Sequence, residues 1–344
     1  MIFALAGNQN SGKTTLFNQL TGSNQHVGNF PGVTVEKKEG VIRKHLDAKV
    51  VDLPGIYSLS PYTSEEIVTR DYLLSGHIDG IINIVDATNI ERNLYLSMQL
   101  IELGLPMVIA LNMMDEVRSN GTSIDMKALS EEFGVRIVPI AAAKNEGVDE
   151  LIEAAISAVQ RRRQPKRLDF CTGAVHRAIH SIAHMIEDHA LRAGVPMRFA
   201  ATKLLEGDEP MLERLQLSEN EQEMLCHTVS EMEQELSTDR AAAMADMRYT
   251  FIERICAGTV VKTGASKEHE RSVRIDRILT HRSLGLPVFL LIMGLVFWLT
   301  VGVLGAALST VLEVGVAGVS GWVEQGLIEF GTNPVLRSLI FDGI

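Results

Sequence analysis

The chain has 344 residues, a length that corresponds to about two domains of ordinary size. Its 43 acidic residues exceed its 32 basic residues and give a net charge of −11, so nucleic acid, which needs a basic surface, is not the expected main partner. Three cysteines are too few for a disulfide framework and are typical of a reducing cytosolic setting. The mean hydropathy of +0.12 is high beside 22% charged residues, so apolar residues must be concentrated in one segment.

Residues 1–160 alternate short apolar runs with segments of helical periodicity. The apolar runs predict strands at Ile2–Ala6, Lys49–Leu53, Gly80–Val85, Met107–Leu111 and Val135–Ile140. The periodic segments predict helices at Lys13–Leu20, Glu91–Glu102, Asp125–Phe133 and Val148–Gln160. This alternation predicts an α/β fold with a mostly parallel sheet, to which Val33–Arg43 adds an antiparallel edge strand.

A basic cluster at residues 161–167 marks the next boundary. It is interpreted as a solvated linker rather than a nucleic-acid patch, because no aromatic residues interleave for base stacking. The strand signals then fade, and helices are predicted at Val175–Arg192, Met197–Glu206, Glu219–Leu236 and Arg240–Val261. This part is expected to be a small all-α helical domain.

A long apolar stretch lies near the carboxyl end, with no charged residue or histidine from Leu284 to Leu312. It exceeds the ~20 residues needed to cross a bilayer. The stretch predicts a first transmembrane helix over 284–304, a basic cytosolic linker over 265–283 and a membrane-associated segment over 305–344. The basic residues before the stretch place its amino-terminal side in the cytoplasm, and the start at Met1 has no signal-peptide pattern.

A phosphate-binding motif follows the first predicted strand and precedes the first predicted helix. It reads Gly7-Asn8-Gln9-Asn10-Ser11-Gly12-Lys13-Thr14, with Thr15 next, and matches G-x-x-x-x-G-K-[ST]. Glycines allow the backbone N–H groups to converge on phosphate oxygens. Lys13 is expected to reach the β and γ oxygens and the Thr14 hydroxyl to ligate Mg²⁺.

Two further motifs follow later strands. Asp52 ends an apolar strand, where it can hold Mg²⁺ through water, and Gly55 is placed so that its N–H can meet a γ-phosphate; a generic strand-to-turn Asp-x-x-Gly is the alternative. In Asn112-Met113-Met114-Asp115, the carboxylate of Asp115 can accept from guanine N1–H and the 2-amino group, and adenine would leave that charge unpaired. The segment Ala142-Ala143-Lys144 fits a loop whose backbone N–H meets guanine O6, although Ala142 replaces the usual serine. The motifs predict a GTP-binding rather than an ATP-binding site.

The order of these motifs resembles translation-factor-type GTPases, and the chain resembles the bacterial ferrous iron transport protein B (FeoB) family. The resembling stretches are Gly7–Gly22, Val27–Gly40, Val51–Ser60, Ile82–Leu100 and Asp276–Leu299. The resemblance implies a G-domain over 1–162 and, over 163–264, a helical domain that modulates nucleotide release. It also implies many more membrane helices, so a chain that stops at Ile344 is expected to be an amino-terminal fragment.

The resemblance further implies roles for a mobile loop, Val27–Glu36, and for a potassium ion. Thr34, with Gly32 and Val33 beside it, would be the switch threonine that coordinates Mg²⁺ in the GTP state. Ile56 stands where Ras-like enzymes carry a water-orienting Gln, so intrinsic hydrolysis is expected to be slow. In potassium-activated relatives the residue matching Asn10 helps hold K⁺. The expected catalytic residues are Asn10, Lys13, Thr34 and Gly55.

Three histidines recur every four residues on one predicted helix, at His176, His180 and His184. An i,i+4 pair of imidazoles can chelate a divalent metal. A solvated polar face is the favoured interpretation, and these residues are not assigned to a site.

The leading hypothesis is a GTPase of the bacterial inner membrane, with residues 1–283 in the cytoplasm, that binds GTP or GDP with Mg²⁺ and controls Fe(II) uptake. The alternative is a membrane-anchored regulatory GTPase that acts on a cytosolic partner without transport. Small cytosolic accessory proteins and a homo-oligomer are left open as further partners.

Overall fold

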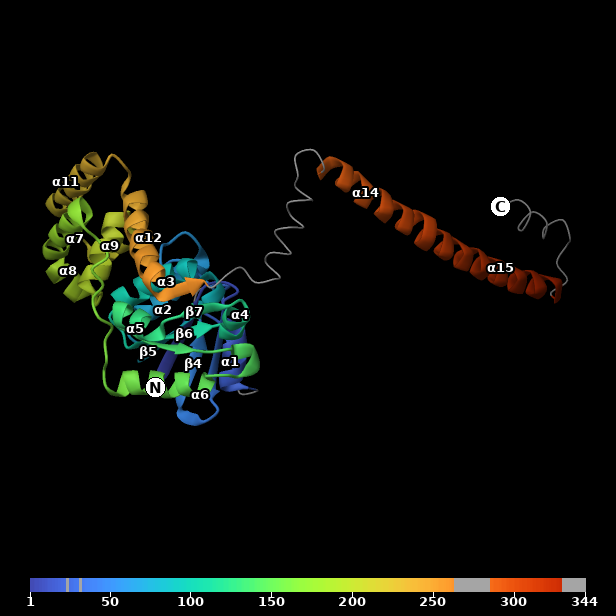
Figure 1. The fold of residues 1–344 in the computed structure, drawn as a ribbon, viewed down its shortest axis with the longest axis horizontal. Coiled ribbons are helices and arrows are strands. Elements are labelled where there is room, and N and C mark those ends of the chain that lie inside the picture. Colours follow the sequence, from blue (N-terminus) through green and yellow to red (C-terminus); the bar gives the residue numbers. More distant parts are fainter. Residues whose placement is uncertain (23–24, 31–32, 263–284, 330–344) are drawn as a thin grey trace. The chain divides into compact units, whose positions relative to one another are not determined.

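The computed structural model describes residues 1–22, 25–30, 33–262 and 285–329, which belong to two units, Met1–Ala265 and Ser266–Ile344 (Figure 1). Gly32 of the predicted site and the predicted basic linker over 265–283 lie outside the described residues.

A seven-stranded sheet with the order β2-β3-β4-β1-β5-β6-β8 forms the centre of the first unit. Its strands are β1 Ile2–Gly7, β2 Gln25–Asn29, β3 Glu36–Ile42, β4 His45–Asp52, β5 Gly80–Asp86, β6 Met107–Asn112 and β8 Arg136–Pro139. Strands β4, β1, β5, β6 and β8 are parallel, whereas β2 and β3 are antiparallel. The predicted mostly parallel sheet is confirmed.

The antiparallel edge differs from the prediction in one respect. The strand expected from Val33 begins at Glu36, and it is not the edge, because β2 pairs outside it. The sequence of β2 is polar and its side chains are mostly exposed, so it lacks the apolar pattern that identifies a buried strand.

Helices cover both faces of the sheet, and the side chains of β1 alternate between two apolar clusters. Phe3 and Leu5 belong to one cluster, with residues of α1 Lys13–Thr21 and α6 Val148–Gln160. Ala4 and Ala6 belong to the other, with α3 Ile90–Glu102 and α5 Met126–Phe133. The helices of the sheet-containing half that were not predicted are short, α2 Ser64–Leu73 and α4 Met114–Ser119.

The second half of this unit is helical, as predicted. It contains α7 Gly173–Met185, α8 Glu187–Ala193, α9 Met197–Glu206, α10 Glu209–Leu215, α11 Glu219–Leu236 and α12 Arg240–Thr259. The helix expected over 175–192 is interrupted at Ile186, and the helix expected to reach Val261 ends at Thr259. The following strand, β9 Val260–Lys262, pairs antiparallel with β7 Thr122–Ile124, so the chain returns to the sheet-containing half.

A buried charge cluster joins the two halves. The guanidinium of Arg248, on α12, pairs with Glu102 of α3 at 3.4 Å and with Glu206 of α9, and its side chain is fully buried. Burial raises the pKa of the Glu102 carboxyl. Burial alone would also raise that of Glu206, but Arg248 and Lys203 outweigh it and lower this pKa to about 2. One guanidinium therefore pairs with carboxylates from both halves.

The second unit contains a continuous apolar helix. It comprises α14 Gly285–Phe297, a π-helical stretch at Trp298–Gly305, and α15 Ala306–Glu329. The candidate membrane span, Gly285–Val323, has 39 residues, which at ~1.5 Å per residue is about 58 Å, well beyond the ~30 Å hydrocarbon core. The apolar helix therefore continues past residue 304, into the segment that was predicted to be membrane-associated.

Arg248→Ala is predicted to lower the free energy of unfolding by about 3–5 kcal/mol, because it leaves Glu102 and Glu206 buried without their common partner. Urea unfolding of a protein comprising residues 1–262, followed by circular dichroism, measures this. The matched control is Arg177→Ala, since Arg177 pairs with Glu235 at 2.6 Å but both side chains are more than half exposed. The control is expected to lose less than about 1 kcal/mol. Equal losses in the two variants would contradict the assignment.

Candidate functional site

The predicted motifs lie at the carboxyl ends of neighbouring parallel strands. The phosphate-binding motif follows β1, Asp52 ends β4, Asn112 ends β6, and Ala142–Lys144 form a short helical turn after β8. The strand order places these ends along one edge of the sheet. This edge is where open α/β sheets bind ligands.

The phosphate loop, residues 7–14, has the backbone that a close approach to an anion requires. Asn10 and Gly12 have positive φ angles of 63° and 90°. A Cβ at Gly12 would lie 2.2 Å from Asn112 Nδ2, so only glycine fits there. Ser11 Oγ donates to the Asn8 carbonyl at 2.8 Å and braces the loop from within. The amino terminus of α1 carries no side-chain cap, and its free N–H groups can therefore bind phosphate.

Two opposite charges lie side by side under this loop. Lys13 Nζ is 3.3 Å from Asp52 Oδ1, and both side chains are largely buried. Burial raises the pKa of the Asp52 carboxyl, although Lys13 acts to lower it. The contact is an ion pair, and Asp52 Oδ1 accepts no hydrogen bond from the described residues. This oxygen can therefore bind a cation, or a water molecule coordinated to one. Thr14 and Thr15, in the first turn of α1, are exposed.

The turn after β4 packs directly against the phosphate loop. A Cβ at Gly55 would lie 3.0 Å from Gln9 Cγ and 3.1 Å from Gln9 Cα, and Ile56 N donates to the Gly7 carbonyl at 3.3 Å. The Ile56 side chain is buried in the apolar core. The position after Gly55 therefore presents no polar side chain to the site.

Asn112 connects three loops. Its Nδ2 donates to the Ser11 carbonyl at 2.9 Å, and its Oδ1 accepts from Ala142 N at 2.9 Å. Met113 has a positive φ of 63°. Two residues further on, Asp115 forms an ion pair with Lys144, with 2.9 Å between Oδ2 and Nζ. The hydrogen bond from Lys144 lowers the pKa of the Asp115 carboxyl, which keeps this carboxylate ionised. Ala143 is exposed beside it. The structure thus brings the predicted base-reading residues together and fastens them to the phosphate loop.

Thr34 lies elsewhere on the edge of the sheet. It is exposed, next to Val33, in the connection between β2 and β3. Among the described residues no hydrogen bond or ion pair joins Thr34 to the phosphate loop. The connection is held from its other side, since buried Phe30 contacts the Tyr72 ring of α2 edge-on at 5.6 Å.

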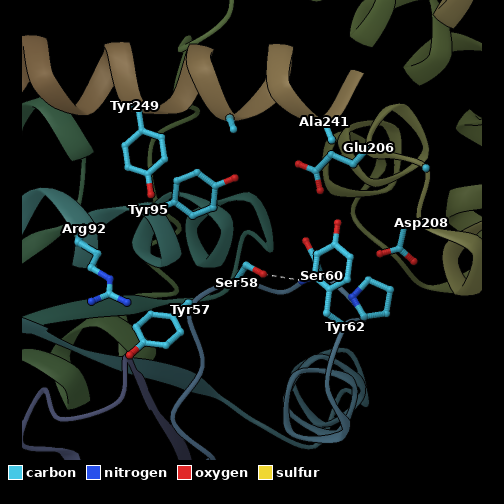
Figure 2. Close-up of a pocket in the computed structure, with 13 residues that line it drawn as sticks. Tyr57, Ser58, Ser60, Tyr62, Arg92, Tyr95, Glu206, Asp208, Ala241 and Tyr249 are labelled. Atoms are coloured by element: carbon cyan, nitrogen blue, oxygen red, sulfur yellow. Dashed lines mark hydrogen bonds between the residues drawn. The ribbon is translucent and has the colours of Figure 1, made fainter. Parts of the chain in front are cut away.

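A cavity of about 550 Å³, which sequence reasoning missed, lies between the segment after Gly55 and the helical half (Figure 2). Figure 2 shows Arg92 beside Tyr57, 4.4 Å from its ring centroid, and Tyr95 beside Tyr249, stacked at 5.1 Å. The lining residues of this cavity come from segments more than 100 residues apart, so no local sequence motif predicts it.

The same segment makes buried polar contacts with the helical half. Arg70 Nη1 donates to both carboxylate oxygens of Asp208 at 3.0 Å, and Lys203 Nζ donates to Ser60 Oγ at 3.3 Å. Arg70 and Lys203 lie on α2 and α9, and Asp208 caps α10, so nothing in the local sequence distinguishes them from exposed charged residues. Segment 56–73 is therefore tied to the helical half as well as to the phosphate loop.

A phosphate loop between the first strand and first helix of a mostly parallel sheet, with an N-x-x-D loop fastened to it, defines the G-domain class of P-loop nucleotide-binding proteins. Comparison with known families agrees with this class. Residues 1–155 match the family described as ferrous iron transport protein B, and residues 173–261 match the FeoB cytosolic helical domain. The chain belongs to the FeoB family, and the resemblance stated from the sequence is confirmed.

Individual relatives support the same assignment. The Fe(2+) transport protein A/Fe(2+) transporter FeoB fusion protein of Porphyromonas gingivalis is 39% identical over 356 residues, covering 99% of this chain and 41% of that protein. The chain thus spans less than half the length of this relative. A crystal structure of an S. thermophilus NFeoB mutant bound to GDP is 41% identical, with a TM-score of 0.70, and covers 76% of this chain and all of its own. Another, bound to GDP·AlF4⁻, is 42% identical with a TM-score of 0.66, covering 74% of this chain and 99% of its own.

Proposed function

We propose that this chain is the GTP-binding and GTP-hydrolysing part of a membrane protein that takes up Fe(II), with the bound nucleotide controlling uptake. The observation that carries the proposal is the pair of hydrogen bonds by which Asn112 fastens the base-reading loop to the phosphate loop. Family membership and relatives solved with GDP and with GDP·AlF4⁻ support it.

The nucleotide would be held along the sheet edge. The loop N–H groups of residues 7–15 and the Lys13 ammonium face the phosphates. Asp115 accepts from guanine N1–H and the 2-amino group, and Ala142–Lys144 lie where a backbone N–H can meet O6. Adenine would leave the Asp115 carboxylate without donors, so discrimination should be large.

Mg²⁺ fits the donor set of this site. The Asp52 carboxylate has an oxygen without a hydrogen bond, and the Thr14 hydroxyl is exposed at the start of α1. These are hard oxygen ligands, which Mg²⁺ prefers. When bound, the ion neutralises phosphate charge. Thr34 joins them in our proposal through a movement of the β2–β3 connection, whose threonine is free at the surface.

The residues around the γ-phosphate position favour slow hydrolysis unless a cation assists. Buried Ile56 cannot orient water, and the phosphate loop contains no arginine. Asn10 sits in that loop with an amide oxygen suited to K⁺, and Gly55 supplies an N–H. A monovalent cation beside Asn10 would supply the charge that an arginine finger supplies elsewhere.

The apolar helix supports a location in a membrane, in our proposal the bacterial inner membrane. The candidate span at Gly285–Val323 contains one charged residue, Glu313, and basic residues are concentrated before it in the sequence. By the positive-inside rule, residues 1–283 would face the cytoplasm, where GTP is available. A single span cannot enclose an ion path, so uptake would require further spans or copies.

Asp115→Asn is predicted to exchange GTP for XTP as the nucleotide that supports Fe(II) uptake, because the amide offers xanthine a donor where guanine needs an acceptor. The measurement is Fe(II) entry into liposomes that contain the protein expressed from its complete reading frame, with each nucleotide on the cytoplasmic side. Glu116→Gln is the control, since it removes a neighbouring exposed charge, and its Fe(II) uptake should still depend on GTP. Uptake that ignores the nucleotide, or GTP dependence in both variants, would contradict the proposal.

Potassium is predicted to accelerate GTP hydrolysis at least tenfold over sodium, which is about 1.4 kcal/mol of barrier. Asn10→Gly should abolish the acceleration and leave GDP affinity nearly unchanged. Glycine is the suitable replacement because the φ of 63° would strain alanine. Phosphate release is measured in KCl and NaCl, with Asn120→Ala, an exposed asparagine, as the control. Equal rates in the two salts for the unaltered protein would rule out the cation.

A further inference from the structure

The three histidines of α7 form a row on the surface of the helical half (Figure 1 labels α7). The rings of His180 and His184 lie 4.5 Å apart between centroids, with 65° between their planes. The rings of His176 and His180 lie 6.4 Å apart and nearly parallel, at 29°. His180 and His184 are exposed, whereas His176 is partly buried. The closest ring pair is thus also the most accessible.

We propose that His180 and His184 bind a divalent transition-metal ion as a two-imidazole site, with water completing its coordination. Metal–nitrogen bonds of ~2.0–2.1 Å, with ligand angles between square and tetrahedral values, place two imidazole centroids about 4.5–5 Å apart. The observed 4.5 Å lies in that range. The two rings, one helical turn apart on α7, are therefore close enough to bind one ion together.

His176 supports the pair rather than joining it. Its Nδ1 lies 3.7 Å from Cys171 Sγ, and its ring is farther from His180 than the ring of His184 is. No group of three or more His, Cys, Asp or Glu side chains converges as a metal cage in the part of the chain that the structure describes. The site is therefore an open one, with exchangeable ligands, unlike the closed four-ligand sites that stabilise folds.

The neighbouring arginines do not occupy the ring nitrogens. The three histidines line a cavity of about 280 Å³ together with Arg198. The Arg198 guanidinium donates to the Leu168 carbonyl at 3.0 Å and lies over the Phe170 ring. Arg167, also in the lining, pairs with Asp169 at 3.7 Å. Both positive charges weaken cation binding, so the affinity should be modest.

Acidic residues act in the opposite direction. Glu187 and Asp188 form the exposed first turn of α8, three and four residues after His184. Their negative charges favour a divalent cation at this end of α7.

The chemistry of the donors selects the class of ion. Imidazole suits Fe(II), Ni(II), Cu(II) and Zn(II), and affinity follows the Irving–Williams order, so Ni(II) binds more tightly than Fe(II). That the ion met here is transported Fe(II) rests on the proposed function, but metal binding itself does not.

The test uses residues 1–262, since residues 1–265 form one compact unit. A crystallised relative matches 76% of this chain over its own entire length, so this part is expected to fold by itself. Calorimetric titration with Ni²⁺, and with Fe²⁺ under anaerobic conditions, should give one ion per chain. His180→Ala and His184→Ala should each weaken binding by about tenfold or more, at least as much as the loss of an outer-shell partner costs. His227→Ala, another exposed histidine on α11, should bind as the unaltered protein does.

Equal metal affinity in all four proteins, or no Ni²⁺ binding by the unaltered protein, would overturn the proposal. Both histidines are exposed, so circular dichroism should show that each variant folds. GDP titration of the same samples keeps the two proposals separate, because loss of the metal should leave nucleotide affinity unchanged and failure to bind GDP would count only against the proposed function.

Discussion

The nucleotide site depends on one buried amide. Asn112 ends β6 with its side chain 4% exposed, and its two hydrogen bonds connect the loops after β1, β6 and β8. Each bond contributes about 0.5–1.5 kcal/mol, but losing a buried partner costs ~1–3 kcal/mol. Removing this side chain would leave the Ser11 carbonyl and the Ala142 N–H without their partner. The parallel sheet brings the loops to one edge, and Asn112 holds the phosphate loop beside the predicted base-reading loops.

The segment that follows Gly55 is held at both of its ends. Gly55 packs on the phosphate loop, while Arg70 and Ser60 bond to the helical half through Asp208 and Lys203. Since Arg248 also pairs with Glu102 beside the sheet, the helical half shares a buried charge cluster with the G-domain. The two halves are therefore joined by ion pairs that are costly to break.

The sequence predicts what is local and leaves unpredicted what is assembled from distant residues. Continuous apolar runs such as Met107–Leu111 identify the parallel strands, and motif spacing identifies Lys13 and Asp115. Strand β2 was missed because an exposed edge has no apolar pattern, and the break at Ile186 lies inside a segment that is periodic throughout. The partners of Arg248 lie 42 and 146 residues away, so no local pattern could show that this arginine is buried. The motif predicts that Asn112 belongs to a base-recognition loop, but only the folded structure shows that its side chain bridges loops.

The affinity of the Asn112→Ala variant for GDP tests this account most directly. Calorimetric titration of residues 1–262 should show binding weakened by about 10–100-fold, which corresponds to ~1.4–2.7 kcal/mol and to the loss of a buried bridge. Asn112→Asp, which retains the acceptor toward Ala142 but loses the donor toward Ser11, should fall between. Asn120→Ala, an exposed asparagine past α4, should bind GDP normally. If Asn112→Ala folds and binds GDP as tightly as the unaltered protein, the bridge is not what assembles the site and the central claim is wrong.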